Sequence, residues 1–104
     1  MDAQLKRGML EVCVLAAVAA KDSYGYQIVK EVNSCIEITE STLYPILRRL
    51  EGSGALESYS VEHQGRLRRY YRITPVGKEQ IREFLQSRET VMNVYRYIEE
   101  RNQA

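Results

Sequence analysis

Histidine and cysteine are scarce in this sequence, and tryptophan is missing altogether. The 104 residues contain one histidine, His63, and two cysteines, Cys13 and Cys35. The two cysteines do not form a Cys-x-x-Cys pair and His63 lies far along the chain from both, so the spacing of a metal site is missing. The same scarcity leaves no set of nucleophile, base and metal for catalysis. We therefore expect no enzyme, no catalytic residues, no metal site and no cofactor.

Long apolar runs and a strong net charge are missing as well. No run reaches the roughly 18 uncharged apolar residues of a spanning helix, and Glu11 interrupts the apolar stretch near the N-terminus, which argues against a cleavable signal. Fifteen basic and fourteen acidic residues give a formal net charge of +1, unlike that of many nonspecific nucleic-acid binders. We expect a small, soluble, cytoplasmic protein without a membrane partner, whose electrostatic contacts are local.

Helical periodicity predicts three helices in the first half of the chain. The first, residues 5–20, is apolar nearly all round, and its predicted stripe is Leu5, Met9, Val12, Cys13, Ala16 and Ala20. Ser23 is expected to cap the second helix, in which Gly25 either permits a close helix crossing or backbone approach or is a harmless glycine near a helix end. Thr39 is expected to cap the third helix, which ends near Gly52.

Proline inside the third helix needs an explanation. Pro45 lies just past the first four backbone donors, which have no intrahelical partner, so it forfeits about one hydrogen bond. The helix is therefore expected to bend slightly near its start or to begin nearer Ser41. Both solutions are tolerable.

The second half of the sequence predicts a β-hairpin and one long helix. Segments rich in tyrosine, valine and isoleucine flank a Gln64-Gly65 turn, and period-two alternation places Arg69, Tyr71 and Ile73 on one face of the second strand. Thr74 and Pro75 are typical of a helix start. The last helix is expected to reach Asn102, about 42 Å at 1.5 Å per residue.

This order of elements indicates a mainly α fold with a small β-hairpin, a winged helix-turn-helix followed by a long C-terminal helix. Residues 1–74 would form the DNA-binding domain and residues 75–104 the dimerisation helix, within one compact unit. On the third helix Ser41, Pro45 and Arg48 lie opposite the apolar arc, which consists of Leu43, Ile46, Leu47 and Leu50. Tyr44 and Arg49 flank that arc. These side chains can bond phosphates and base edges, although two neighbouring arginines are also compatible with an ordinary solvated face.

The predicted hairpin is locally basic. Between Gln64 and Arg72 the sequence has no acidic residue and four arginines, Arg66, Arg68, Arg69 and Arg72. A positive tip suits contact with phosphate groups. Alternatively, the tyrosines pack on the core and the arginines pair with Glu57 and Glu62 across the strands. Tyr71 is expected in the core, which leaves Arg66 and Arg68 as the better DNA candidates.

The long helix has an apolar stripe that the rest of the chain is too short to cover. Its members recur at steps of four and three residues. A second copy of the chain is the expected cover, so we predict a homodimer. The predicted interface residues are Phe84, Arg88, Val91, Met92, Tyr95 and Ile98.

Four motifs together resemble the PadR family of bacterial transcriptional regulators, in its short subgroup: SYGYQI at 23–28, STLYPILRRLEGSGAL at 41–56, GRLRRYYRIT at 65–74 and PVGKEQI at 75–81. The resemblance implies a homodimeric winged-helix repressor that binds a pseudo-palindromic operator in double-stranded DNA, often near its own gene. The recognition helix and wing would contribute the DNA-binding residues. The candidates are Ser41, Thr42, Tyr44, Pro45, Arg48, Arg49, Gln64, Arg66, Arg68 and Arg69.

The resemblance also implies a small-molecule effector, aromatic or phenolic, that releases the repressor from DNA. Its expected lining is the aromatic and methionine side chains of the last helix together with the inner wall of the first helix. Some relatives hold flat drugs between tryptophans, but this chain has none and carries Arg88 at the corresponding place. The alternative function is a winged-helix protein-interaction module that does not bind DNA, because a fold does not determine function.

Overall fold

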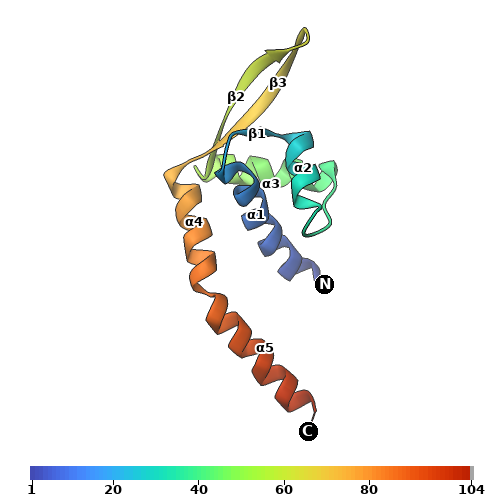
Figure 1. The fold of residues 1–104 in the computed structure, drawn as a ribbon, viewed down its shortest axis with the longest axis vertical. Coiled ribbons are helices and arrows are strands. Elements are labelled where there is room, and N and C mark those ends of the chain that lie inside the picture. Colours follow the sequence, from blue (N-terminus) through green and yellow to red (C-terminus); the bar gives the residue numbers. More distant parts are fainter. Residues whose placement is uncertain (104) are drawn as a thin grey trace.

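Helices dominate the computed structural model, which describes residues 1–103 (Figure 1). The elements in chain order are α1 (Ala3–Ala19), β1 (Ser23–Tyr24), α2 (Gly25–Val32), α3 (Glu40–Gly52), β2 (Leu56–His63), β3 (Arg66–Ile73), α4 (Pro75–Gln86) and α5 (Arg88–Asn102). The predicted winged-helix fold, with its C-terminal helical arm, is confirmed. Within the described residues, no helix combines the length and apolar character needed to cross a membrane.

The core lies between α1, α2 and α3 and continues under the sheet. The buried side chains of α1 are Leu10, Val14, Leu15 and Val18, and the predicted stripe on this helix is therefore wrong. Leu5 is 44% exposed and Met9 is only half-buried. Since α1 is apolar on nearly every side, its periodicity cannot identify the face that the other helices cover.

A short strand, β1, precedes α2 where the sequence predicted only a helix cap. Ser23 pairs with Tyr71 and Tyr24 with Tyr70, so β1 extends the hairpin to an antiparallel sheet of order β1-β3-β2. Tyr24 is the N-cap of α2 and makes no side-chain capping bond. Ser23 is therefore not the cap that the sequence predicted, because the backbone of Ser23 pairs with the free edge of β3.

The hairpin has the predicted Gln64-Gly65 turn. β2 pairs with β3 from Leu56 opposite Ile73 to His63 opposite Arg66. Gln64 and Gly65 both have positive φ, at 52° and 79°, as a tight two-residue hairpin turn requires. Figure 1 shows the hairpin projecting from the helices at the end of the molecule away from the arm.

The third helix begins at Glu40 and is capped as predicted. The Thr39 hydroxyl accepts a hydrogen bond from the Thr42 amide at 3.3 Å. Pro45 lies inside the helix, so the later start near Ser41 does not occur. The helix therefore keeps its full first turn and omits the bond that Pro45 cannot donate.

The C-terminal arm is helical to Asn102 but has one interruption. At Ser87, φ is −83° and ψ is −2°, and both its amide and its hydroxyl donate to the carbonyl of Phe84. The arm therefore consists of two helices that meet at Ser87, where a single helix was expected. Figure 1 shows α5 extending beyond the other helices, and no residue of α5 is buried.

The start of α4 is fixed against the sheet. The Thr74 hydroxyl caps α4 by accepting from the Gly77 amide at 3.2 Å, and Pro75 occupies the first turn as predicted. A Cβ atom at Gly77 would overlap the carbonyl oxygen of Ala55. Glycine at this position therefore allows α4 to lie directly against the backbone that leads into β2.

Candidate nucleic-acid interface

The third helix presents a polar face to solvent, as its sequence predicted. Leu43, Ile46, Leu47 and Leu50 are buried. The candidates on the other side are all exposed except Pro45, which is half-buried: they are Ser41, Thr42, Tyr44, Arg48 and Arg49. Near the helix start, the Thr39 hydroxyl oxygen lies 3.0 Å from the Ser41 hydroxyl and 3.1 Å from the Thr42 hydroxyl. This end of α3 is therefore a cluster of hydroxyl groups.

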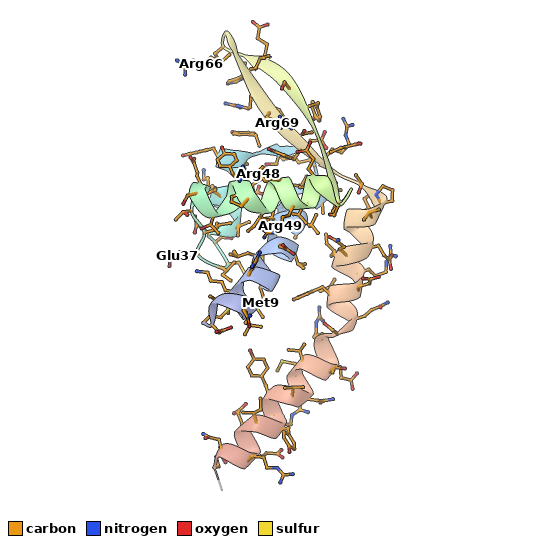
Figure 2. All side chains as sticks on the ribbon, turned by 180° about the vertical axis from the view of Figure 1, so that it is seen from behind. Met9, Glu37, Arg48, Arg49, Arg66 and Arg69 are labelled. Carbon is orange, nitrogen blue, oxygen red and sulfur yellow. The ribbon has the colours of Figure 1, made fainter. Side chains whose placement is uncertain are left out.

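The two neighbouring arginines of α3 have different surroundings. Arg49 extends toward α1 (Figure 2), where its guanidinium group lies 2.9 Å from the Glu11 carboxylate. Arg48 is exposed and makes no ion pair within residues 1–103. A surface pair such as Arg49–Glu11 contributes only about 0–1 kcal/mol, but it directs Arg49 to one side. The outward cation of the helix is Arg48.

The wing arginines are also divided between paired and unpaired groups. Arg69 lies 3.2 Å from Glu51 at the end of α3. Arg72 lies 3.4 Å from both Asp22 and Glu57. The alternative of cross-strand pairing therefore holds for Arg72 and Glu57. It does not hold for Glu62, which faces Leu67 across the strands and makes no ion pair in the described part of the chain.

The arginines nearer the wing tip lack carboxylate partners among the described residues. Arg66 and Gln64 are exposed at the tip, and Figure 2 shows Arg66 there, far from the helices. Arg68 has its guanidinium carbon 4.1 Å from the centre of the Tyr24 ring. Stacking on an aromatic ring holds an arginine without neutralising its charge. The tip therefore keeps its positive charge.

Three tyrosines stiffen the base of the wing. The Tyr70 ring packs edge-on against Tyr24, at a centroid distance of 5.4 Å, and stacks on Tyr59 at 5.8 Å. The Tyr59 hydroxyl donates to the Asp22 carboxylate, and this hydrogen bond raises the pKa of Tyr59. Tyr71 lies in the core as predicted, and burial raises its pKa. The wing is therefore fixed to the α1–β1 connection as well as to the core.

A hollow of about 430 Å³ separates the recognition helix from the wing. It is lined by Tyr24, Gly25, Tyr26, Glu40, Tyr44, Arg68, Arg69 and Tyr71. The structure thus brings Tyr44 of α3 together with two wing arginines, and it adds Tyr24 and Tyr26, which the sequence analysis did not include. The one sequence signal that could have identified these two tyrosines is their position on either side of Gly25. Their place near the wing depends on β1, which was not predicted.

Gly25 makes room for Tyr44. A Cβ atom at Gly25 would lie 2.9 Å from the Tyr44 hydroxyl oxygen and 3.4 Å from the ring carbon that carries it. The approach at this glycine is therefore made by a side chain, and neither the predicted helix crossing nor a backbone approach is seen there among the described residues. The glycine helps to determine where an exposed side chain of the recognition helix lies.

The predicted interface residues of the arm are all exposed in the single chain. They are Phe84, Arg88, Val91, Met92, Tyr95 and Ile98. Met9 of α1 faces the α4–α5 junction, where a hollow of about 150 Å³ is lined by Met9, Phe84, Leu85, Ser87, Arg88, Val91 and Met92. Over residues 1–103, no three His, Cys, Asp or Glu side chains are arranged to hold a metal ion.

Comparison with known proteins gives consistent matches. Residues 14–83 match the sequence profile of the Transcriptional regulator PadR-like family. The chain is 32% identical to Transcriptional regulator Rv3488 of Mycobacterium tuberculosis over 81 residues, which cover 77% of this chain and 76% of that protein.

Solved structures extend this similarity to most of the arm. A transcriptional regulator from Clostridium thermocellum is 32% identical, with a TM-score of 0.82 and coverage of 93% of this chain and 96% of that one. A PadR family transcriptional regulator from Eggerthella lenta is 34% identical, also with a TM-score of 0.82, and the coverage is 93% and 87%. The matches thus extend beyond the winged helix into the C-terminal arm.

The contact between Gly25 and Tyr44 generates a testable prediction. Gly25→Ala should cost about 1 kcal/mol more in the parent than in a Tyr44→Phe background, because removal of the hydroxyl removes the closest contact of the new methyl group. The measurement is the free energy of unfolding in urea for the four proteins of the cycle. Gly52→Ala is the control, since its Cβ would meet no atom within 4 Å. Equal costs in both backgrounds would disprove the predicted coupling.

Proposed function

The chain belongs to the PadR-like family of transcriptional regulators. We propose that it is a cytoplasmic, homodimeric repressor that binds a pseudo-palindromic operator in double-stranded DNA. Residues 1–74 would bind the DNA and residues 75–104 would form the dimer. The observation that carries the proposal is the polar face of α3 together with the uncompensated cations of the wing. Figure 2 shows Arg48 on this helix and Arg66 at the wing tip.

The two arginine positions suit different contacts with a DNA duplex. Arg48 projects from a helix whose opposite face is buried, and an α-helix of this kind fits the major groove. Arg66 and Arg68 lie on a projecting hairpin, where a positive charge can hold phosphate groups. We therefore assign base recognition to Arg48 and backbone contact to Arg66 and Arg68. Ser41, Thr42, Tyr44 and Gln64 supply further donors for phosphates.

Other candidates have supporting roles in this proposal. Arg49 and Arg69 each face a carboxylate, at Glu11 and Glu51, so their guanidinium groups are partly neutralised. Pro45 is half-buried and has no donor. We propose that the two paired arginines orient α3 against α1 and the wing, and that Pro45 offers only apolar contact to the DNA.

Replacing the two kinds of arginine should leave different signatures in DNA binding. Arg48→Ala should cost about 1–3 kcal/mol on the operator and relax the preference at one base position in each half-site. The double variant Arg66→Ala with Arg68→Ala should weaken operator and random DNA by similar factors. It should also reduce the salt slope by about one unit per lost phosphate contact.

Fluorescence anisotropy with operator and scrambled duplexes at several salt concentrations measures both effects. Arg82→Ala on α4 is a suitable control, because Arg82 is exposed, lies outside the candidate surface and pairs locally with Glu79. If Arg48→Ala binds both duplexes like the parent while staying dimeric, the recognition-helix assignment fails. Absence of binding to any duplex by the parent would favour a protein-interaction module.

The dimer is supported by apolar side chains that the single chain leaves in solvent. Val91 is 40% exposed, Tyr95 46% and Ile98 56%. They lie on one face of α5, because they are four and three residues apart. A twofold pair of arms would bury this face symmetrically. It would also present two recognition helices to half-sites that are one helical turn or a multiple of it apart, about 34 Å per turn.

A charge placed within this face should dissociate the dimer. Tyr95→Glu introduces a carboxylate that the proposed interface would desolvate, so it should weaken dimerisation at least about tenfold. Asn93→Glu on the opposite face of α5 is the matched control and should leave the dimer intact. Light scattering and sedimentation across a micromolar concentration series distinguish the two results. A parent protein that remains monomeric there would rule out the proposed assembly.

Effector release is the last part of the proposal. The lining predicted from sequence forms a hollow of only about 150 Å³ in one chain, whereas ligand pockets typically have about 300–1,000 Å³. A hollow of about 410 Å³ lies between α1 and α3, with apolar walls that include Leu10 and Ile46 and with Lys6 and Arg7 beside them. A phenolic acid matches this combination of apolar wall and cations. Bound there, it would contact the flank of the recognition helix that carries Thr42, Pro45 and Arg49.

Removing the cations of this hollow should weaken the response to such an acid. Lys6→Ala with Arg7→Ala should raise the concentration of para-hydroxycinnamic acid needed for operator release about tenfold, equivalent to 1.4 kcal/mol. Lys30→Ala on α2 is the control for a general loss of positive charge. The fluorescence anisotropy of a labelled operator, measured as the acid is added, reports the release. Loss of response in Met92→Ala alone would instead favour the hollow at the arm, and no release of the parent would exclude this class of effector.

A further inference from the structure

The only two cysteines of the chain lie side by side in the fold. Cys13 is half-buried on α1, and Cys35 is exposed in the turn that follows α2. Both line one surface hollow of about 290 Å³, together with Ala16, Ala17, Glu31 and Val32. Burial raises the pKa of the Cys13 thiol, and the nearby Cys35 thiol raises it further. Residues separated by 21 intervening positions thus open onto the same hollow.

The surroundings of the pair permit the small movement that an S–S bond needs. A disulfide requires the sulfur atoms to approach to about 2.05 Å. Ala16 and Ala17 are the small neighbours on α1. Cys35 is in a turn, where its amide donates to the Val32 carbonyl at 2.9 Å. A turn residue can adjust its backbone more easily than a residue in the middle of a helix.

The same turn leads directly into the recognition helix. The Asn33 side chain donates to the Ile38 carbonyl at 3.0 Å and accepts from the Ile38 amide at 2.8 Å. Ile38 precedes Thr39, the cap of α3. A change in the position of Cys35 is therefore transmitted through few bonds to the start of α3.

We propose that Cys13 and Cys35 are a thiol oxidation site, at which a peroxide forms a reversible disulfide that ties α1 to the α2–α3 turn and weakens operator binding. The site is independent of the phenolic effector, and its formation does not depend on the proposed DNA function. The effect of the disulfide on operator binding does depend on that proposed function.

The chemistry uses one peroxide for each disulfide. The exposed Cys35 thiol loses its proton and attacks a peroxide oxygen, the O–O bond breaks, and hydroxide leaves and takes up that proton as water. The Cys13 sulfur then attacks the Cys35 sulfenic acid, the S–O bond breaks, and the hydroxyl group leaves with the Cys13 proton as a second water. Two thiols lose two electrons, and the peroxide gains them.

The environments of the two thiols support this order of reaction. Burial raises the pKa of Cys13, and the neighbouring Cys35 raises it further. Because the thiolate is the reactive form, Cys13 is a poor first nucleophile. Cys35 is the solvent-accessible one, and Cys13, which lines the same hollow, would resolve its sulfenic acid before further oxidation.

Mass spectrometry of the full-length dimer tests the site directly. After treatment with hydrogen peroxide, each chain should lose two hydrogen atoms, and dithiothreitol should restore them. Trypsin cleaves after Lys21 and Lys30, so the two cysteines fall in separate peptides that only a disulfide can join. Mixed isotope-labelled chains distinguish a bond within one chain from a bond between chains. Cys13→Ser and Cys35→Ser are the controls and should both lack the linked peptide.

Operator affinity of the oxidised and reduced dimers tests the consequence. The oxidised parent should bind several-fold more weakly, and the peroxide-treated Cys13→Ser variant should not. A sulfinic acid at Cys35 with a free Cys13, or a bond only between chains, would overturn the site. An intrachain disulfide with unchanged operator affinity would overturn its regulatory role. Failure of the parent to bind DNA in either state would count against the proposed function and the regulatory role, but not against the disulfide.

Discussion

The burial of one face of α3 is the constraint on which the rest of this molecule depends. Leu43, Leu47 and Leu50 are almost inaccessible to solvent, and at about 25 cal/mol per Å² of apolar surface their burial favours one orientation of the helix strongly. With that orientation fixed, the polar positions between them must point outward. Arg48 therefore needs no partner in the chain to be held on the outer surface; the leucines beneath it determine its direction.

Carboxylates from other elements then determine which arginines remain available. Glu11 of α1 lies beside Arg49, and Glu51 at the end of α3 lies beside Arg69. Each pair is weak by itself, but each joins the recognition helix to a neighbouring element. The pairs direct Arg49 and Arg69 toward their carboxylates, while Arg48 and the wing tip keep their charge. A chain that is almost neutral overall can in this way present a locally basic surface.

The arm differs from α3 in this respect, because its helices make few packing contacts with the rest of the chain. The Thr74 cap and the close approach at Gly77 attach the first turn of α4 to the sheet, whereas α5 has no buried residue. Apolar residues in a regular stripe without a cover are costly in water, and the described part of the chain buries none of those on α5. The core of the winged helix is complete without it.

Local signals in the sequence determined the types of element and most of their ends: the Thr39 and Thr74 caps, the Gln64-Gly65 turn and the alternation that buries Tyr71. Each depends on residues a few positions apart, and each was predicted. Only the tertiary structure decided which face of α1 is buried, that Ser23 joins β3, that Arg49 meets Glu11 and that Cys13 and Cys35 line the same hollow. These contacts join residues that are far apart in the chain, and they depend on how whole elements pack. Periodicity describes each element by itself and therefore contains no information about such contacts.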